Sequence, residues 1–275
     1  MEGYYYTIAK RQDGRNDRTV TRDFVLDIWM MKLLRYAFLS HFPVAALLLL
    51  APGIVIASNR NNLEHVTSLR NDYFALRHGQ SKANVKKIIA SNPNVACMEY
   101  GLSELGNSQA RSAGETVVQT YHACKGKYKG IAILSSDLLR AKETAEHVAE
   151  AARDYNIPIY NNKVVLETRL RERGFGKYDL GSDTHYHDVW KDDAIDPTHE
   201  IMDVESVMSV TDRASACIVE WDEILQDFLV VCVAHGDVLQ ILQTAFNKMD
   251  GSKHRTLDHL ETAILRPLVL SQTNS

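Results

Sequence analysis

The chain has 275 residues, of which 45% are hydrophobic and 24% are charged. This composition is typical of a globular protein with one large domain or two small ones. The formal net charge of −4 argues against a nucleic-acid-binding protein, which would usually be strongly basic. The four cysteines form no C-x-x-C pair, which argues against zinc sites and thioredoxin-like chemistry.

Residues 1–70 differ in composition from the rest of the chain and are predicted to form an N-terminal extension. Within them, residues 36–58 carry no charge unless His41 is protonated. As a helix this segment would reach roughly 35 Å, enough to cross a bilayer core. Three interpretations stay open: a single membrane-spanning anchor, a cleaved signal peptide, or a plainer third one, which is a buried or disordered extension or a wrongly assigned start. The first two predict a membrane-anchored or secretory-pathway protein, and the third is compatible with a cytoplasmic one.

Residues 71–275 alternate between short apolar runs and segments with helical periodicity, and they are predicted to form one folded domain. The expected strands are 73–76, 131–134, 163–166, 228–234 and 257–265. The expected helices are 81–90, 107–123, 138–154, 205–226 and 238–247. Continuous apolar strands between helices indicate a sheet that is buried on both faces. We therefore predict an α/β fold, a three-layer α/β/α sandwich with a mostly parallel central sheet.

Two of the expected strands are each followed by a histidine and a glycine. Arg77-His78-Gly79 follows the strand 73–76, and His235-Gly236 follows the strand 228–234. Open α/β sheets place their ligand sites at these carboxyl ends. Histidine can attack phosphorus and carry a phosphoryl group, and arginine offers a planar fork to phosphate oxygens. Glycine lets the backbone turn tightly beside a bound anion.

A second arginine, Arg140, lies near the start of the expected helix 138–154. A cation in a first turn opposes the helix dipole, so this position indicates an anion to bind, although a solvent-exposed helix arginine is the plainer alternative. At the helix 81–90, Ser81 is expected to cap the amino end. Asn84 and Gln80 are expected to share one face of that helix.

Six ordered segments carry a resemblance to a known family: 77–84, 101–110, 134–145, 170–176, 204–206 and 233–236. Their order, spacing and content resemble the histidine phosphatase superfamily, also called phosphoglycerate mutase-like, over residues 71–270. The resemblance implies a nucleophilic His78 and a phosphoryl-binding His235. It also implies that Arg77 and Arg140 clamp the phosphate. The further residues expected to contact substrate are Gly79, Asn84, Ser136 and Gly236.

Glu172 is expected to be the general acid that protonates the leaving oxygen and later helps to deprotonate water. That task needs a carboxyl pKa raised toward neutrality. On an extended segment the neighbouring Arg171 and Arg173 would point away from the side of Glu172. A surface charge cluster is the plainer interpretation of this segment, and Asp179 or Asp183 could take the role of the acid instead.

His185 and His187 would share one face of a strand and could suggest a metal site. Their segment also suits a solvated loop, and histidine phosphatases use no metal. We therefore expect no metal and no cofactor, and we assign this segment to contact with the non-phosphate part of the substrate. The expected partner is a phosphorylated small molecule and not a nucleic acid, with single-pass membrane association left open. The oligomeric state does not follow from the sequence.

The sequence thus predicts a metal-independent phosphomonoester hydrolase that acts through a phosphohistidine. One alternative is a phosphoglycerate mutase-type phosphotransferase with the same covalent step. Mutases of the family carry a longer, basic and proline-rich insertion before the Glu-Ser segment, whereas residues 174–204 are short and rich in Asp and His, which favours a hydrolase. The other alternative is a non-catalytic phosphate-binding protein, which the filled catalytic positions disfavour.

Overall fold

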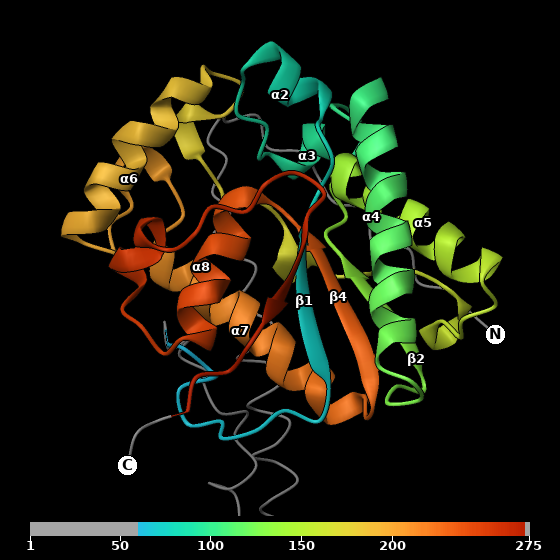
Figure 1. The fold of residues 1–275 in the computed structure, drawn as a ribbon. Coiled ribbons are helices and arrows are strands. Elements are labelled where there is room, and N and C mark those ends of the chain that lie inside the picture. Colours follow the sequence, from blue (N-terminus) through green and yellow to red (C-terminus); the bar gives the residue numbers. More distant parts are fainter. Residues whose placement is uncertain (1–59, 273–275) are drawn as a thin grey trace, which may run out of the picture. The chain divides into compact units, whose positions relative to one another are not determined.

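The computed structural model of the protein describes residues 60–272 (Figure 1). The hydrophobic segment 36–58 lies outside the described residues. Within the described part, no helix combines the length and apolar character needed to cross a membrane. The described residues belong to one compact unit.

A five-stranded sheet forms the centre of this unit. The strands are β1 (Asp72–Arg77), β2 (Gly130–Ser135), β3 (Val165–Leu166), β4 (Phe228–Ala234) and β5 (Leu265–Leu268). They lie in the order β3-β2-β4-β1-β5, and β5 alone among them runs antiparallel to its neighbour. The alternation along each strand divides the core into two layers. Tyr73 and Ala75 pack on one face of the sheet, and Phe74 and Leu76 pack on the other.

Helices cover both faces of the sheet. Helices α4 (Glu104–Ala123) and α5 (Leu139–Asp154) pack on one face, and α7 (Val207–Ile224) and α8 (Gly236–Phe246) pack on the other (Figure 1). The predicted three-layer sandwich with a mostly parallel sheet is therefore confirmed. The remaining helices are α2 (Lys82–Lys86), α3 (Pro93–Ala96) and α6 (Tyr186–Ile195). Short 3₁₀ turns occupy Tyr160–Asn162, Thr168–Leu170, Gly176–Tyr178, Asp183–His185, Ile201–Asp203 and Gly251–Thr256.

Three local predictions were wrong. The helix expected over 81–90 ends after Lys86, because Lys87 adopts a left-handed conformation with φ of 56°. The strand expected over 257–265 begins only at Leu265, and a 3₁₀ turn ends at Thr256 instead. The segment that contains His185 and His187 is mostly helical, because it enters α6.

The described residues that precede Asn71 belong to the same packed unit. Leu63 is fully buried in the core between the sheet and α7 and α8. The Asn62 side chain hydrogen-bonds the Asp212 carboxylate at 2.9 Å and the Ser215 hydroxyl at 3.1 Å. Asn62 and Leu63, which precede Asn71, are therefore part of the packed unit.

Candidate active site

The carboxyl ends of three adjacent strands bring the candidate residues together. In the parallel pairing of β1 with β4, Arg77 lies opposite Ala234, so His78 and His235 leave the sheet side by side. Their rings are 5.1 Å apart between centroids, in an edge-to-face arrangement. Strand β2 lies on the other side of β4 and brings Ser136 to the same edge. Residues that are distant in sequence thus form one cluster because the strands are parallel and in register.

His78 is buried and has both ring nitrogens engaged. Its Nδ1 lies 2.7 Å from the Gly79 carbonyl oxygen, which can only accept, so Nδ1 carries the proton. Its Nε2 accepts a hydrogen bond of 3.0 Å from Nε of Arg140. Burial, followed by the positive charges of Arg140 and Arg77, holds the pKa of His78 well below its ordinary value. The imidazole is therefore neutral, with its lone pair on Nε2 facing the basic side of the site.

Gly79 is required by close packing against α4. A Cβ at this position would lie 2.4 Å from the backbone oxygen of Gly106, closer than any side chain tolerates. Its amide N–H donates to the Thr144 hydroxyl at 3.1 Å. Residues 78–80 form neither a turn nor a bend, so the tight turn expected there is not found, and the need for glycine comes from the neighbouring helix.

Each of the two arginines has a buried nitrogen without a hydrogen-bond partner in the described part of the chain. Nη1 of Arg77 is held by Nε2 of His259 and by the Leu260 carbonyl, both at 3.0 Å. Among the described residues, Nε of Arg77 and Nη1 of Arg140 are buried and have no hydrogen-bond partner. Arg140 is the second residue of α5 and is only 4% exposed. Buried guanidinium groups with free donors fit an anionic ligand, because an unpaired buried donor is otherwise costly.

His235 is held by Ser136 rather than by the backbone. Its Nε2 lies 2.8 Å from the Ser136 hydroxyl oxygen, and its Nδ1 is buried without a partner among the described residues. Burial, followed by the charge on Arg140, keeps the pKa of His235 well below its ordinary value. Ser136 also accepts from the Leu138 amide at 3.2 Å. The structure therefore places Ser136 behind His235.

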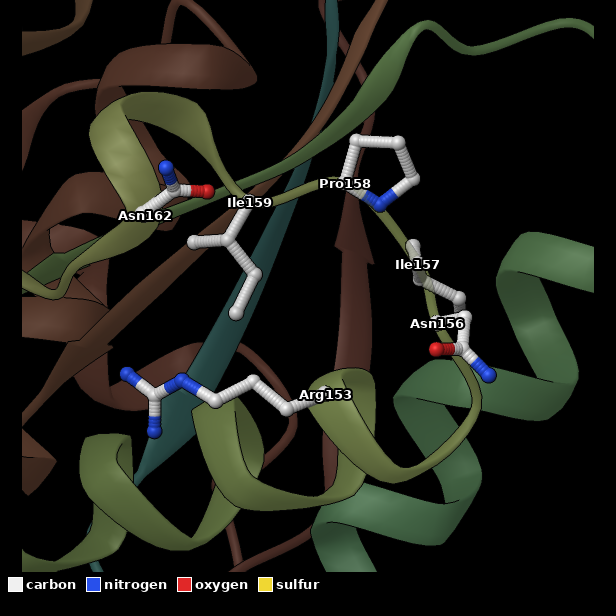
Figure 2. A pocket seen from close by; sticks show the side chains of 6 residues that line it. All are labelled: Arg153, Asn156, Ile157, Pro158, Ile159 and Asn162. Carbon is white, nitrogen blue, oxygen red and sulfur yellow. The ribbon is translucent and has the colours of Figure 1, made fainter.

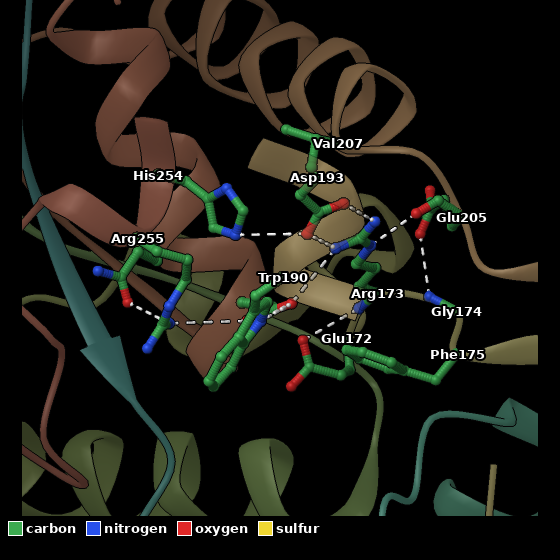
Figure 3. Close-up of polar contacts among 12 residues, drawn as sticks. Glu172, Arg173, Gly174, Phe175, Trp190, Asp193, Glu205, Val207, His254 and Arg255 are labelled. Atoms are coloured by element: carbon green, nitrogen blue, oxygen red, sulfur yellow. Dashed lines mark hydrogen bonds and ion pairs between the residues drawn. The ribbon is translucent and has the colours of Figure 1, made fainter. Parts of the chain in front are cut away.

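Glu172 is buried beside this cluster, with 8% of its surface exposed. Its Oε1 accepts a 3.0 Å hydrogen bond from the backbone N–H of Arg173 (Figure 3). Burial raises the pKa of Glu172 most, and the negative charge of Asp237 raises it further, to about 7. The charge of Arg140 acts in the opposite direction. A carboxyl group with this pKa can both donate and accept a proton near neutral pH.

The alternation along an extended segment had predicted only that Arg173 faces away from Glu172, and the structure places Arg173 in the protein interior. Its side chain is fully buried and forms two 2.7 Å hydrogen bonds with the Asp193 carboxylate (Figure 3). His199 also contacts Asp193, at 2.9 Å. The sequence offered no signal for this ion pair, because Asp193 lies in α6, which was not predicted. Arg171 instead forms a partly exposed ion pair with Asp137.

A cavity of about 210 Å³ opens in front of Arg77 and Glu172. The segment 174–204 supplies one wall through Asp183, Tyr186 and Trp190. Asn84, Ile88, Gly236, Asp237, Arg255 and His259 complete the lining. Sequence reasoning missed Asp237, although it directly follows the His235-Gly236 motif. It also missed Arg255 and His259, which come from segments without a recognised motif.

Several expected residues have other contacts. The Asn84 side chain lines the cavity but also accepts from the Ser81 amide, which closes the capping box at the start of α2. Gln80 precedes the helix and bonds the Ser103 hydroxyl beside α4, so the prediction of a face shared with Asn84 was wrong. Asp179 accepts from the amides of Ser91 and Asn92, which leaves Asp183 as the alternative acid that faces the cavity.

A larger hollow, of about 350 Å³, lies at the opposite end of α5 from Arg140 (Figure 2). Its lining combines Arg153, two asparagines and the aliphatic run Ile157, Pro158 and Ile159. Its lining contains no histidine, cysteine or carboxylate, so we place the chemistry at the smaller cavity.

Residues 73–272 match the profile of the histidine phosphatase superfamily, branch 1. The chain belongs to this superfamily. The resemblance noted in the sequence is thereby confirmed, and the protein is an enzyme of the phosphatase and mutase type. A protein of Salmonella paratyphi A, named "Probable phosphoglycerate mutase GpmB", is 27% identical over 175 residues, which cover 62% of this chain and 71% of that protein.

Solved structures of the superfamily with the same fold include phosphatases. A mycobacterial glucosyl-3-phosphoglycerate phosphatase in complex with VO3 is 25% identical and aligns with a TM-score of 0.55, covering 71% of this chain and 91% of that one. The alpha-ribazole phosphatase of Shigella flexneri is 18% identical, with a TM-score of 0.53 and coverage of 74% and 96%. The second likeness concerns the fold alone.

Proposed function

We propose that this histidine phosphatase hydrolyses small phosphomonoesters by carrying the phosphoryl group on His78. The observation that carries the proposal is the neutral His78 ring, whose Nδ1–H is bound to the Gly79 carbonyl and whose Nε2 lone pair faces the arginines. This tautomer leaves Nε2 as the attacking atom. In the free protein, Nε of Arg140 donates a hydrogen bond to this lone pair. When phosphorus binds to Nε2 it replaces that hydrogen bond, and the Arg140 donors then bind phosphate oxygens.

The reaction has two balanced steps. In the first, the Nε2 lone pair forms a bond to phosphorus, the P–O bond to the alcohol breaks, and the leaving oxygen takes a proton from Glu172. In the second, water attacks phosphorus, the Glu172 carboxylate takes a proton from that water, and the P–N bond electrons return to Nε2. Glu172 ends protonated, as it began. A carboxyl pKa of about 7 suits both directions of proton transfer.

The charge on the transferred group is stabilised by Arg77, Arg140 and His235. Phosphoryl transfer concentrates negative charge on three equatorial oxygens, so fixed donors at the site supply most of the stabilisation. We assign Nε of Arg77, Nη1 of Arg140 and Nδ1–H of His235 to these oxygens, because each is buried and unpartnered within residues 60–272. Ser136 then acts by donating to Nε2 of His235, which fixes the tautomer that carries a proton on Nδ1.

The remaining expected residues shape the phosphate pocket. Asn84 lies on the cavity wall and fixes the amino end of α2. Gly236 lies beside Arg77, because a Cβ there would be 3.4 Å from the guanidinium carbon, an ordinary van der Waals contact. Gly79 allows the backbone that carries His78 to approach α4. None of these roles requires a metal, and we expect activity to survive a chelator.

The segment 174–204 favours a hydrolase over a mutase. It forms α6 and supplies one wall of a cavity of about 210 Å³, so it leaves room for a water molecule beside a small product alcohol. The names of relatives include both a mutase and phosphatases. We also propose that residues 36–58 direct the protein to a membrane, either as an anchor or as a cleaved signal.

The decisive experiment is capture of the phosphoryl group. The wild-type protein is mixed with a ³²P-labelled substrate, denatured rapidly, and scored for acid-labile label. His78→Ala should carry none and should turn over no substrate, while its circular dichroism stays unchanged. His122→Ala removes an exposed histidine at the end of α4 and should label like the wild type. Equal labelling of the His78→Ala variant would show that the phosphoryl group is carried elsewhere.

A further inference from the structure

Asp237 lies beside the proposed acid, and no feature of the sequence had drawn attention to it. It follows Gly236 in the first turn of α8 and is 4% exposed. It lines the same cavity as Glu172. Arg173 supports both groups, because its backbone N–H donates to Glu172 and its Nη1 lies 3.6 Å from Oδ2 of Asp237.

The contacts of Asp237 stabilise its carboxylate form. Nε1 of Trp190 donates to Oδ1 at 2.9 Å and to Oδ2 at 3.1 Å. Besides Arg173, Nη1 of Arg255 lies 3.9 Å from Oδ1. A carboxylate in the first turn of a helix is also favoured by the helix dipole. Every partner of Asp237 thus donates a hydrogen bond or carries positive charge.

Glu172 has fewer contacts that stabilise its carboxylate form than Asp237 has. One backbone N–H, that of Arg173, donates to it, and the positive charges of Arg140 on α5 and Arg77 on β1 act on it from the phosphate side. From α6, Tyr186 faces the same space. Carboxyl groups that share one cavity each disfavour the charged form of the other.

We infer that Asp237 is a positioning residue for the catalytic proton, because its carboxylate keeps Glu172 protonated in the free enzyme. A protonated Glu172 adapts the site to phosphomonoesters with basic leaving oxygens, such as alkyl phosphates. This inference rests on the proposed function, in which Glu172 is the acid. The shift of the Glu172 pKa agrees with it, because the charge of Asp237 is the largest contribution after burial.

The test is the pH profile of kcat/KM for the full chain and its Asp237→Asn variant. An alkyl phosphate and p-nitrophenyl phosphate are compared, because only the first leaving group needs the proton. Loss of the charge should move the basic limb for the alkyl phosphate down by about one pH unit. At pH 8 this corresponds to an about tenfold smaller protonated fraction of Glu172, and the alkyl-to-nitrophenyl rate ratio should fall about as much.

Three further variants keep the result interpretable. Asp237→Glu retains the charge and should leave the basic limb in place. Trp190→Phe removes the indole donor but keeps an aromatic ring and the Asp237 charge, so the limb should not move down. Asp237→Ser removes the charge with a smaller side chain and should repeat the shift, which covers the case in which the asparagine variant fails to fold.

Failure of this inference and failure of the proposed function would give different results. If neither uncharged variant moves the limb, while Glu172→Gln still slows the alkyl phosphate selectively, Asp237 does not set the protonation of the acid and the proposed function stands. If Glu172→Gln slows both substrates equally, the assignment of the acid itself is wrong. A downward shift in Asp237→Glu as well would trace the effect to side-chain shape and overturn the inference.

Discussion

Replacing Glu172 by glutamine should stabilise this protein above neutral pH while it impairs catalysis. The side chain is buried, and glutamine preserves its shape and the Oε1 acceptor that receives the Arg173 amide. The substitution therefore removes an ionisable group and little else. The free energy of unfolding should rise because the variant has no buried negative charge at high pH, whereas the wild-type enzyme has one.

The size of the gain follows from the pKa of Glu172, which is raised from its usual value near 4.5 to about 7. Each pKa unit corresponds to about 1.4 kcal/mol, so a difference of this size amounts to roughly 3 kcal/mol. Because the folded-state pKa is the higher one, the stabilising contribution is complete below pH 4.5 and is lost as the pH rises to 7. The substituted glutamine has no proton to lose, so the variant escapes this penalty.

The assay is thermal unfolding of both proteins between pH 4.5 and 8.5. For a domain of this size, roughly 3 kcal/mol corresponds to a Tm difference of about 6–12 °C in favour of the variant, developing between pH 4.5 and 7. Glu99→Gln, at an exposed position, should show no such growth with pH. A Tm difference that stays constant over this range would refute the claim that Glu172 is protonated at neutral pH.

The same variant should lose activity selectively. Turnover of an alkyl phosphate should fall by about 10²–10⁴, the usual contribution of a general acid, whereas p-nitrophenyl phosphate should be slowed far less. In the wild type, kcat/KM for the alkyl phosphate should decline as the pH rises through about 7, because the proton on Glu172 is lost there. Equal losses on both substrates would transfer the role to Asp183.

Breaking the buried ion pair between Arg173 and Asp193 by Arg173→Met should lower the free energy of unfolding by about 3–5 kcal/mol. Arg173→Met combined with Asp193→Leu should lower it less, because no unpaired charge stays buried. A urea titration that finds the double variant less stable than the single one would contradict this. If residues 36–58 span a membrane, the full chain should resist carbonate extraction; free solubility at the unprocessed mass would exclude both the anchor and the signal peptide. A chain that begins at Ala57 should be active, and one that begins at Asn71 should melt earlier because it lacks Leu63. Release of phosphate should exceed interconversion of 2- and 3-phosphoglycerate, and the reverse order would identify a mutase.

Much of this fold and of its central site was predictable because it depends on local sequence. The run 228–234 forms β4 over its full predicted length, since seven consecutive apolar residues suit a strand buried on both faces. His78 and His235 follow their strands directly, so a parallel sheet necessarily brings them to one edge. Arg140 was identified by its position in a helix that starts close to the predicted residue.

Other features depended on partners that are distant in sequence. The need for glycine at position 79 comes from the Gly106 backbone, and the direction of the Arg173 side chain is set by Asp193. Neither partner could be identified from its local sequence, and α6 was missed because its Asp- and His-rich sequence has little apolar periodicity.

The sequence by itself determined the layered fold, the strand-end histidines and the two arginines, because strand length, apolar runs and strand-end position are properties of neighbouring residues. Tertiary structure alone decided the protonation of Glu172. Burial and the charge of Asp237 raise its pKa, and both arise only when α8 packs beside the segment that carries the acid. Proton affinity in a buried site is a sum over surrounding charges, and the folded chain alone brings those charges together.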